Sequence, residues 1–120
     1  MLTLAPTTRV FVARDPVDMR RSFDGLAALV RDFLQNDPLS GHLFVFRNRG
    51  GDRIKILWWD RDGLALFYKR LEEGSFPVPR MADGALQIEL TPEDLQLLLQ
   101  GFDPTRVERP RRFSLATMGR

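Results

Sequence analysis

The chain has 120 residues and a formal net charge of +2, with 43% hydrophobic and 28% charged residues, which predicts one globular domain with its own core. It contains no cysteine and one histidine, which excludes disulfide bonds, thiolate catalysis, cysteine-type zinc sites and nearly all histidine metal clusters. No run approaches the ~20 apolar residues of a membrane span, and the N-terminus is too weakly apolar for a signal peptide, so we expect a cytoplasmic protein without membrane contact.

The first expected elements are a strand at residues 9–13 and a helix at about residues 22–35. The helix is indicated by apolar side chains at helical spacing, namely Leu26, Leu29, Val30 and Phe33. Either Asp18 or Ser22 can cap the start of this helix, and Pro38 stops it.

Charged residues surround the start of this helix. Three of them are carboxylates, which at a helix N-terminus accept backbone donors and meet the positive end of the helix dipole: Asp15, Asp18 and Asp24. Arg20 and Arg21 flank the same helix start, which makes them candidates for contacts with phosphate.

The central stretch, residues 42–71, predicts three consecutive antiparallel strands. Residues 42–46 and 53–59 alternate with period 2 and are rich in β-branched and aromatic side chains. A glycine-containing hairpin loop at residues 48–52 joins them, and residues 62–63, Asp-Gly, are expected to form the next turn.

Symmetric closure of both loops would set the pairing of these strands. Arg47 then faces Arg53, and Lys55 faces Val45 in one neighbouring strand and Arg70 in the other. One face of the sheet carries cations and aromatic rings: Arg47, Arg53, Lys55, Arg70, Tyr68 and Trp59. The other face carries an apolar layer: Phe44, Phe46, Ile54, Ile56, Trp58 and Phe67.

The basic face has two interpretations. Like charges directly across a ladder are destabilising unless an anion lies over them, and phosphate with stacked bases would suit this mixture of cations and aromatic rings. Alternatively, the long side chains lie along a sheet face that a helix half covers, with only their charged ends in water.

The remaining elements follow a loop at residues 72–79. A short strand is expected at residues 85–90, and a helix at residues 92–100 begins at Thr91 as N-cap and ends at Gly101. Its buried face is expected to carry Leu95, Leu98 and Leu99.

These elements predict an α+β fold: a mainly antiparallel sheet of about five strands with two amphipathic helices. The first helix should cover the face that carries Phe44, Ile54 and Trp58, and the second should pack on the sheet or at its edge. The same interpretation predicts that Phe44, Ile56 and Trp58 are buried and that Arg53 and Lys55 are exposed.

The domain is expected to span residues 1–104, followed by a basic, flexible tail at residues 105–120. Residues 101–120 hold five arginines against two acidic residues, whereas residues 1–100 are close to neutral. Arginine also dominates the whole chain, where Lys55 and Lys69 are the two lysines among 18 cationic residues. Arginine suits phosphate, although a GC-rich genome would produce the same bias.

Two long blocks carry a resemblance to a known family: VDMRRSFDGLAALV, and then DPLSGHLFVFRNRGGDRIKILWWDRDGLALFYKRLEEGSF. In these blocks the chain is similar to the TnpB accessory protein, the second open reading frame, of the sixty-six family of bacterial insertion sequences. The resemblance covers about residues 9–104. It implies a requirement in DNA transposition beside a separately encoded transposase, without an established biochemical activity and without catalytic residues to carry over.

Three functions remain open at this point. The first is a non-catalytic accessory factor that binds DNA, and its candidate residues are Arg20, Arg21, Arg47, Arg49, Arg53, Lys55, Trp59, Tyr68, Arg70, Arg109, Arg111 and Arg112. The second is an adaptor that docks onto the transposase through Trp58 or Trp59 and Tyr68. The third, which we do not favour, is an enzyme with Mg²⁺ on Asp60, Asp62 and a further carboxylate. We expect no cofactor and no metal, and His42 to serve packing or hydrogen bonding.

Overall fold

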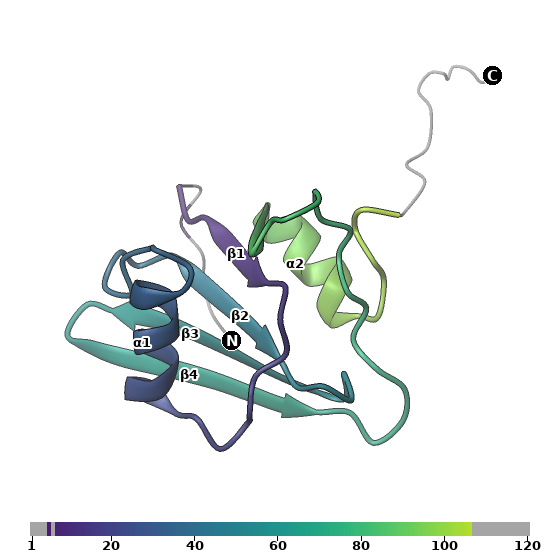
Figure 1. Cartoon of the computed structure of the whole chain (residues 1–120), viewed down its shortest axis with the longest axis horizontal. Coiled ribbons are helices and arrows are strands. Elements are labelled where there is room, and N and C mark those ends of the chain that lie inside the picture. The colour runs from purple at the N-terminus through teal and green to yellow at the C-terminus, as the bar shows by residue number, and fades with distance from the viewer. Residues whose placement is uncertain (1–4, 6, 107–120) are drawn as a thin grey trace.

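The computed structural model describes residue 5 and residues 7–106 (Figure 1). Along the chain the elements are β1 (Val10–Ala13), α1 (Phe23–Asp32), β2 (Leu43–Arg47), β3 (Arg53–Asp60), β4 (Gly63–Arg70), β5 (Gln87–Leu90) and α2 (Pro92–Leu99). Within this described part, no helix has the length and hydropathy that crossing a bilayer requires.

The five strands form one sheet in the order β4-β3-β2-β1-β5. Three of the four neighbouring pairs are antiparallel, and β1 pairs with β2 in parallel. A parallel pair needs a crossover connection, and α1 supplies it between β1 and β2. The predicted α+β fold with a mainly antiparallel five-stranded sheet is therefore confirmed.

The two helices cover opposite faces of the sheet, and Figure 1 shows α1 lying across β3 and β4. The core under α1 contains Phe11, Ala13, Leu26, Ala27, Val30, Leu34, Phe44, Phe46 and Leu57. The core under α2 contains Val10, Val12, Leu43, Val45, Ile54, Ile56, Phe76, Leu90, Leu95 and Leu98. Burial on both faces explains why β1 and four residues of β2 are buried without alternation.

The prediction that the first helix covers Phe44, Ile54 and Trp58 is therefore only partly correct. Phe44 packs under α1 as expected, whereas Ile54 and Trp58 belong to the core on the other face. Phe44 and Ile56 are fully buried as predicted, but Trp58 is only half-buried.

The error comes from the pairing of β2 with β3, which is shifted by one residue from the expected pairing. Arg47 lies opposite Ile54, and Phe46 lies opposite Lys55. Asn48 causes the shift, because its side-chain oxygen accepts from the Arg53 amide at 3.0 Å and its backbone amide donates to the Arg53 carbonyl at 3.1 Å. A one-residue shift moves side chains to the opposite face, so Arg47 leaves the face that carries Arg53.

The pairing of β3 with β4 differs by two residues, which changes partners but keeps the faces. Asp60 pairs with Gly63, so the turn is formed by Arg61 and Asp62 and not by the expected residues 62–63. Arg61 adopts the left-handed backbone conformation, with φ of 57°. As a result, Arg53 lies directly opposite Arg70.

The helix ends differ in their caps. Thr91 caps α2 as predicted, because its hydroxyl accepts from the Asp94 amide at 3.1 Å. Ser22 occupies the cap position of α1 but makes no side-chain capping bond. Asp18 does not cap α1 either, since its carboxylate accepts from the Arg20 amide at 2.9 Å, in the loop before the helix.

Candidate nucleic-acid interface

An open hollow at one end of the β3–β4 ladder brings together three side chains of the predicted site. The hollow has a volume of about 410 Å³ and is lined by Arg53, Tyr68, Arg70 and Glu72. Period-2 alternation places Arg53, Tyr68 and Arg70 on one face of the sheet. We call this hollow the basic hollow.

Its side chains are partly paired with one another. An Nη of Arg53 donates to the Tyr68 hydroxyl at 3.2 Å, and the Arg70 guanidinium donates to the Glu72 carboxylate at 3.1 Å. Both members of the Arg70–Glu72 pair are more than half exposed, so water screens it and it contributes little to stability. Two arginines against one carboxylate leave the basic hollow with a net positive charge.

Lys55 lies on the same face, but the prediction that it is exposed is wrong. Only 5% of its surface is accessible, and its ammonium group donates to the carbonyls of Met19 and Arg21 at 2.7 Å each. The same ammonium lies 4.5 Å from the centre of the Tyr68 ring. Two of the three N–H donors of the ammonium are bonded to main-chain carbonyls, so Lys55 holds the loop before α1 and does not face solvent.

Arg20 and Arg49 both lie near Asp18, Arg20 in the loop before α1 and Arg49 in the loop between β2 and β3. Arg20 is almost fully exposed and forms an ion pair of 2.6 Å with Asp18. Hydrogen bonds from the side chain and then the backbone of Arg20 lower the pKa of Asp18 to about 2, so this carboxylate is ionised at neutral pH. Arg49 lines a shallow hollow with Pro16, Val17 and Asp18.

Arg47 and Trp59 do not join the basic hollow. Arg47 lies on the other face, where burial lowers the pKa of its guanidinium and an Nη atom packs over Gly51. Trp59 shares the face of Arg53 but lies six residues further along β3, where it pairs with Leu64 of β4. At the usual rise of a strand, Trp59 is ~20 Å from Arg53.

The basic tail predicted at residues 105–120 lies outside the described residues beyond residue 106. Arg109, Arg111 and Arg112 therefore have no structural description, and their role stays a prediction. At the start of that segment, the Thr105 hydroxyl accepts from the Arg80 amide at 2.8 Å, and Pro104 is buried.

The two aspartates considered for catalysis lie at the β3–β4 hairpin. Asp60 closes the β3–β4 hairpin and Asp62 lies in its turn. Among residues 5 and 7–106, no group of three His, Asp or Glu side chains is placed to hold a metal ion. His42 accepts a hydrogen bond from the Arg9 amide at 3.0 Å and packs edge-on against Phe11, as expected.

Sequence comparison identifies the family. A family model described as "IS66 Orf2 like protein" matches residues 8–109, which is most of the chain. The chain belongs to the IS66 Orf2-like family. Membership implies an accessory role in the transposition of an insertion sequence, which confirms the resemblance found in the two sequence blocks.

Two relatives of this IS66 Orf2-like protein come from Sinorhizobium fredii (strain NBRC 101917 / NGR234). "Uncharacterized protein y4jC" is 46% identical over 101 residues, covering 84% of this chain and 85% of the relative. "Uncharacterized protein y4hO" is 42% identical over 113 residues, covering 92% of this chain and 96% of the relative. No solved structure matches the chain significantly.

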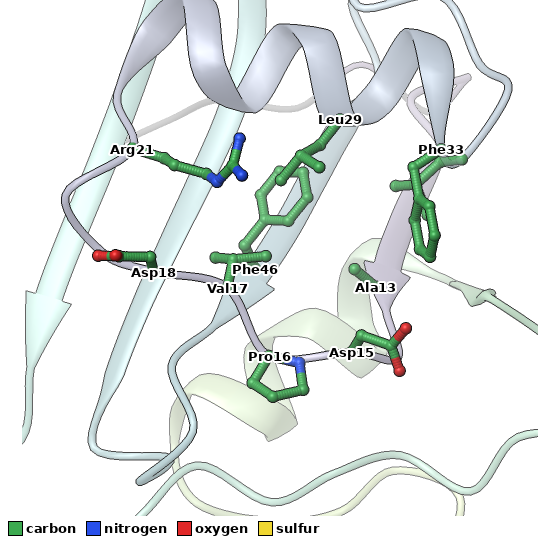
Figure 2. Close-up of a pocket in the computed structure, with 10 residues that line it drawn as sticks. Ala13, Asp15, Pro16, Val17, Asp18, Arg21, Leu29, Phe33 and Phe46 are labelled. Atoms are coloured by element: carbon green, nitrogen blue, oxygen red, sulfur yellow. The ribbon is translucent and has the colours of Figure 1, made fainter.

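The IS66 Orf2-like protein also has an apolar pocket that the sequence did not predict (Figure 2). It lies between α1 and the segment that follows β1, and it is lined by Ala13, Asp15, Pro16, Val17, Asp18, Arg21, Leu29, Phe33, Leu34 and Phe46. Arg21, predicted as a phosphate contact, lines this pocket and not the basic hollow. The sequence placed Phe33 on the apolar stripe of the first helix, but its exposure, which marks the pocket, is visible only in the structure.

Proposed function

We propose that this IS66 Orf2-like protein assists transposition by binding nucleic acid through the basic hollow, with Arg20 and Arg49 as flanking contacts. One observation carries the proposal: Arg53 and Arg70 lie directly opposite each other in the ladder, beside the exposed ring of Tyr68. Like charges in this position repel, and a phosphate between the two guanidinium groups would relieve that repulsion.

The ring of Tyr68 adds a surface for a base. The Lys55 ammonium lies over the ring at 4.5 Å, and Tyr68 as a whole remains 47% exposed. A base can stack on the accessible side while the two arginines hold the adjacent phosphate. This combination of stacking ring and backbone contacts is typical of proteins that bind single strands without sequence preference.

The proposal assigns no chemistry to this chain. The resemblance implies a separately encoded transposase, which would cut and join the DNA, while this protein would hold a strand or an element end. The contacts need no cofactor, because phosphate is bound by guanidinium groups alone. We therefore propose a non-catalytic, DNA-binding accessory protein whose partners are the DNA of the element and its transposase.

The test measures affinity against salt concentration for a duplex carrying the element end and for one of its single strands. Arg53→Gln and Arg70→Gln should each lower the magnitude of the slope of log affinity against log salt by about 0.9 for duplex and about 0.7 for single strand. Lys69→Gln is the matched control, because Lys69 neighbours Arg70 on β4 but points to the other face. Its slope should stay near that of the wild type.

Tyr68 separates stacking from charge. Tyr68→Ala should weaken single-strand binding by about 1–3 kcal/mol if one base stacks on the ring, and Tyr68→Phe should retain most of the affinity. Absence of salt-sensitive binding, or equal effects of the Arg53, Arg70 and Lys69 variants, would refute the proposal. If those arginine variants instead disrupt a complex with the transposase, the same hollow serves an acidic patch on that protein.

A further inference from the structure

The apolar pocket is formed by segments that lie far apart in the sequence. Ala13 ends β1, Val17 belongs to the following loop, Leu29 and Phe33 come from α1 and its end, and Phe46 comes from β2. Figure 2 shows these side chains surrounding a common space under the helix. We call it the α1 pocket.

The size of the α1 pocket indicates what it can hold. Its volume is about 240 Å³. Small-molecule and cofactor sites usually measure about 300–1,000 Å³, so this pocket is better suited to one large side chain than to a cofactor. Pockets that receive a single apolar anchor are typical of the energetic centre of protein–protein interfaces.

The charges at the rim indicate what should accompany that side chain. Asp15 is paired with Arg14 at 2.9 Å, and Asp18 is paired with Arg20 at 2.6 Å. The Arg21 guanidinium has no hydrogen bond or ion pair with any of the described residues, although its charge adds a small contribution to the lowered pKa of Asp18. Figure 2 shows it pointing into the space beside Phe46. The rim thus offers one cation for an incoming carboxylate.

We propose that the α1 pocket docks a segment of the transposase of the same element, a segment that inserts one large apolar side chain and places an acidic residue against Arg21. The basic hollow takes no part in this contact, so the proposal stands apart from nucleic-acid binding. Phe33, which is 42% exposed, forms the accessible wall that the incoming side chain covers. Charge complementarity at Arg21 selects an acidic segment over a neutral or basic one.

The test uses the full chain and the purified transposase, and it measures their affinity by isothermal titration calorimetry. Phe33→Ala should weaken binding about tenfold or more, as expected for loss of part of an anchor pocket. Phe23→Ala is the matched control, because Phe23 is 44% exposed at the other end of α1 and does not line the pocket. Its affinity should stay within about twofold of the wild type.

A second pair of variants tests the charge. Arg21→Gln should weaken binding and reduce its salt dependence, whereas Arg31→Gln, which changes an exposed arginine of α1 that does not line the pocket, should do neither. Phe33→Ala and Phe23→Ala should keep wild-type affinity for nucleic acid, while Arg53→Gln should keep wild-type affinity for the transposase. The two proposals can therefore fail separately.

Several results would overturn the docking proposal. The first is a transposase that does not bind the wild type, and the second is binding that Phe33→Ala leaves unchanged. A third is a wild-type protein that dimerises in sedimentation experiments and becomes monomeric in Phe33→Ala, since the occupant would then be a second copy.

Discussion

The ammonium group of Lys55 donates a hydrogen bond of 2.7 Å to the main-chain carbonyl of Arg21. A second bond of the same length reaches the carbonyl of Met19, so one buried cation of β3 holds the loop that leads into α1. Buried charge is costly unless it is paired or hydrogen-bonded, and here carbonyl oxygens and the Tyr68 ring provide the compensation. Lys55 thereby fixes the loop that carries Arg20.

Removing the ammonium group should destabilise the fold. Lys55→Met leaves two carbonyl groups without their charged donor, and we expect a loss of about 1.5–3 kcal/mol in the free energy of unfolding. Urea denaturation measures this directly. Lys69→Met is the control, since Lys69 is an exposed lysine on the neighbouring strand and should change stability by less than about 0.5 kcal/mol. Equal effects of the two substitutions would contradict the anchoring role.

The loop between β2 and β3 offers a test of backbone strain. Gly51 has φ of +76°, and an added Cβ would lie 2.8 Å from an Nη atom of Arg47 and 3.2 Å from the Ser75 Cβ. Gly51→Ala should therefore cost about 1–2 kcal/mol or more in stability. Gly50→Ala is the adjacent control, because its Cβ would meet nothing closer than 3.5 Å and its φ is not positive. A thermal melt that ranks Gly50→Ala below Gly51→Ala would be inconsistent with this geometry.

Removing the hydroxyl group at the two helix starts should have different effects on the free energy of unfolding. Thr91→Ala removes the hydroxyl that accepts from the Asp94 amide and should cost about 0.5–2 kcal/mol. Ser22→Ala removes a hydroxyl that makes no capping bond at α1, so its cost should be close to zero. Both values come from chemical denaturation curves. A larger loss for Ser22→Ala would mean that α1 is capped by this serine in solution.

Asp18 should give the stability a pH dependence at acid pH. Its folded-state pKa of about 2 lies below the ordinary value of 3.8, so the folded protein binds fewer protons than the unfolded chain between these values. The stabilisation is complete above about pH 4 and is lost as pH falls from there to about 2. Asp18→Asn should thus be less stable than the wild type at neutral pH and converge with it near pH 2. A stability difference that stays constant over this range would exclude the contribution.

Much of the fold could be predicted because its signals are local. Alternation at residues 42–71 identified β2, β3 and β4, and Thr91-Pro92 identified the start of α2. The strand pairing was harder to predict from the sequence. It depends on the Asn48 side chain, which accepts a hydrogen bond from the Arg53 amide and so shifts the pairing of β2 with β3. A difference of one residue in loop length was enough to move Arg47 to the other face.

The candidate site could be predicted only in part, for a related reason. Period 2 places Arg53, Tyr68 and Arg70 on one face whatever their partners are, so their grouping was predictable. The burial of Lys55 was not, because it depends on a loop more than thirty residues away in sequence that lies over it. The α1 pocket was equally inaccessible, since its walls come from β1, α1 and β2 and meet only in the folded chain.

The position of β1 in the sheet has a consequence for folding during translation. The first strand of the chain lies in the interior of the sheet, between β2 and β5, and β5 also precedes the helix that brings Leu95 and Leu98. A nascent chain on the ribosome therefore exposes one edge of β1 until residues 87–90 have been translated. A chain that ends before that point should therefore expose an unpaired strand edge and aggregate.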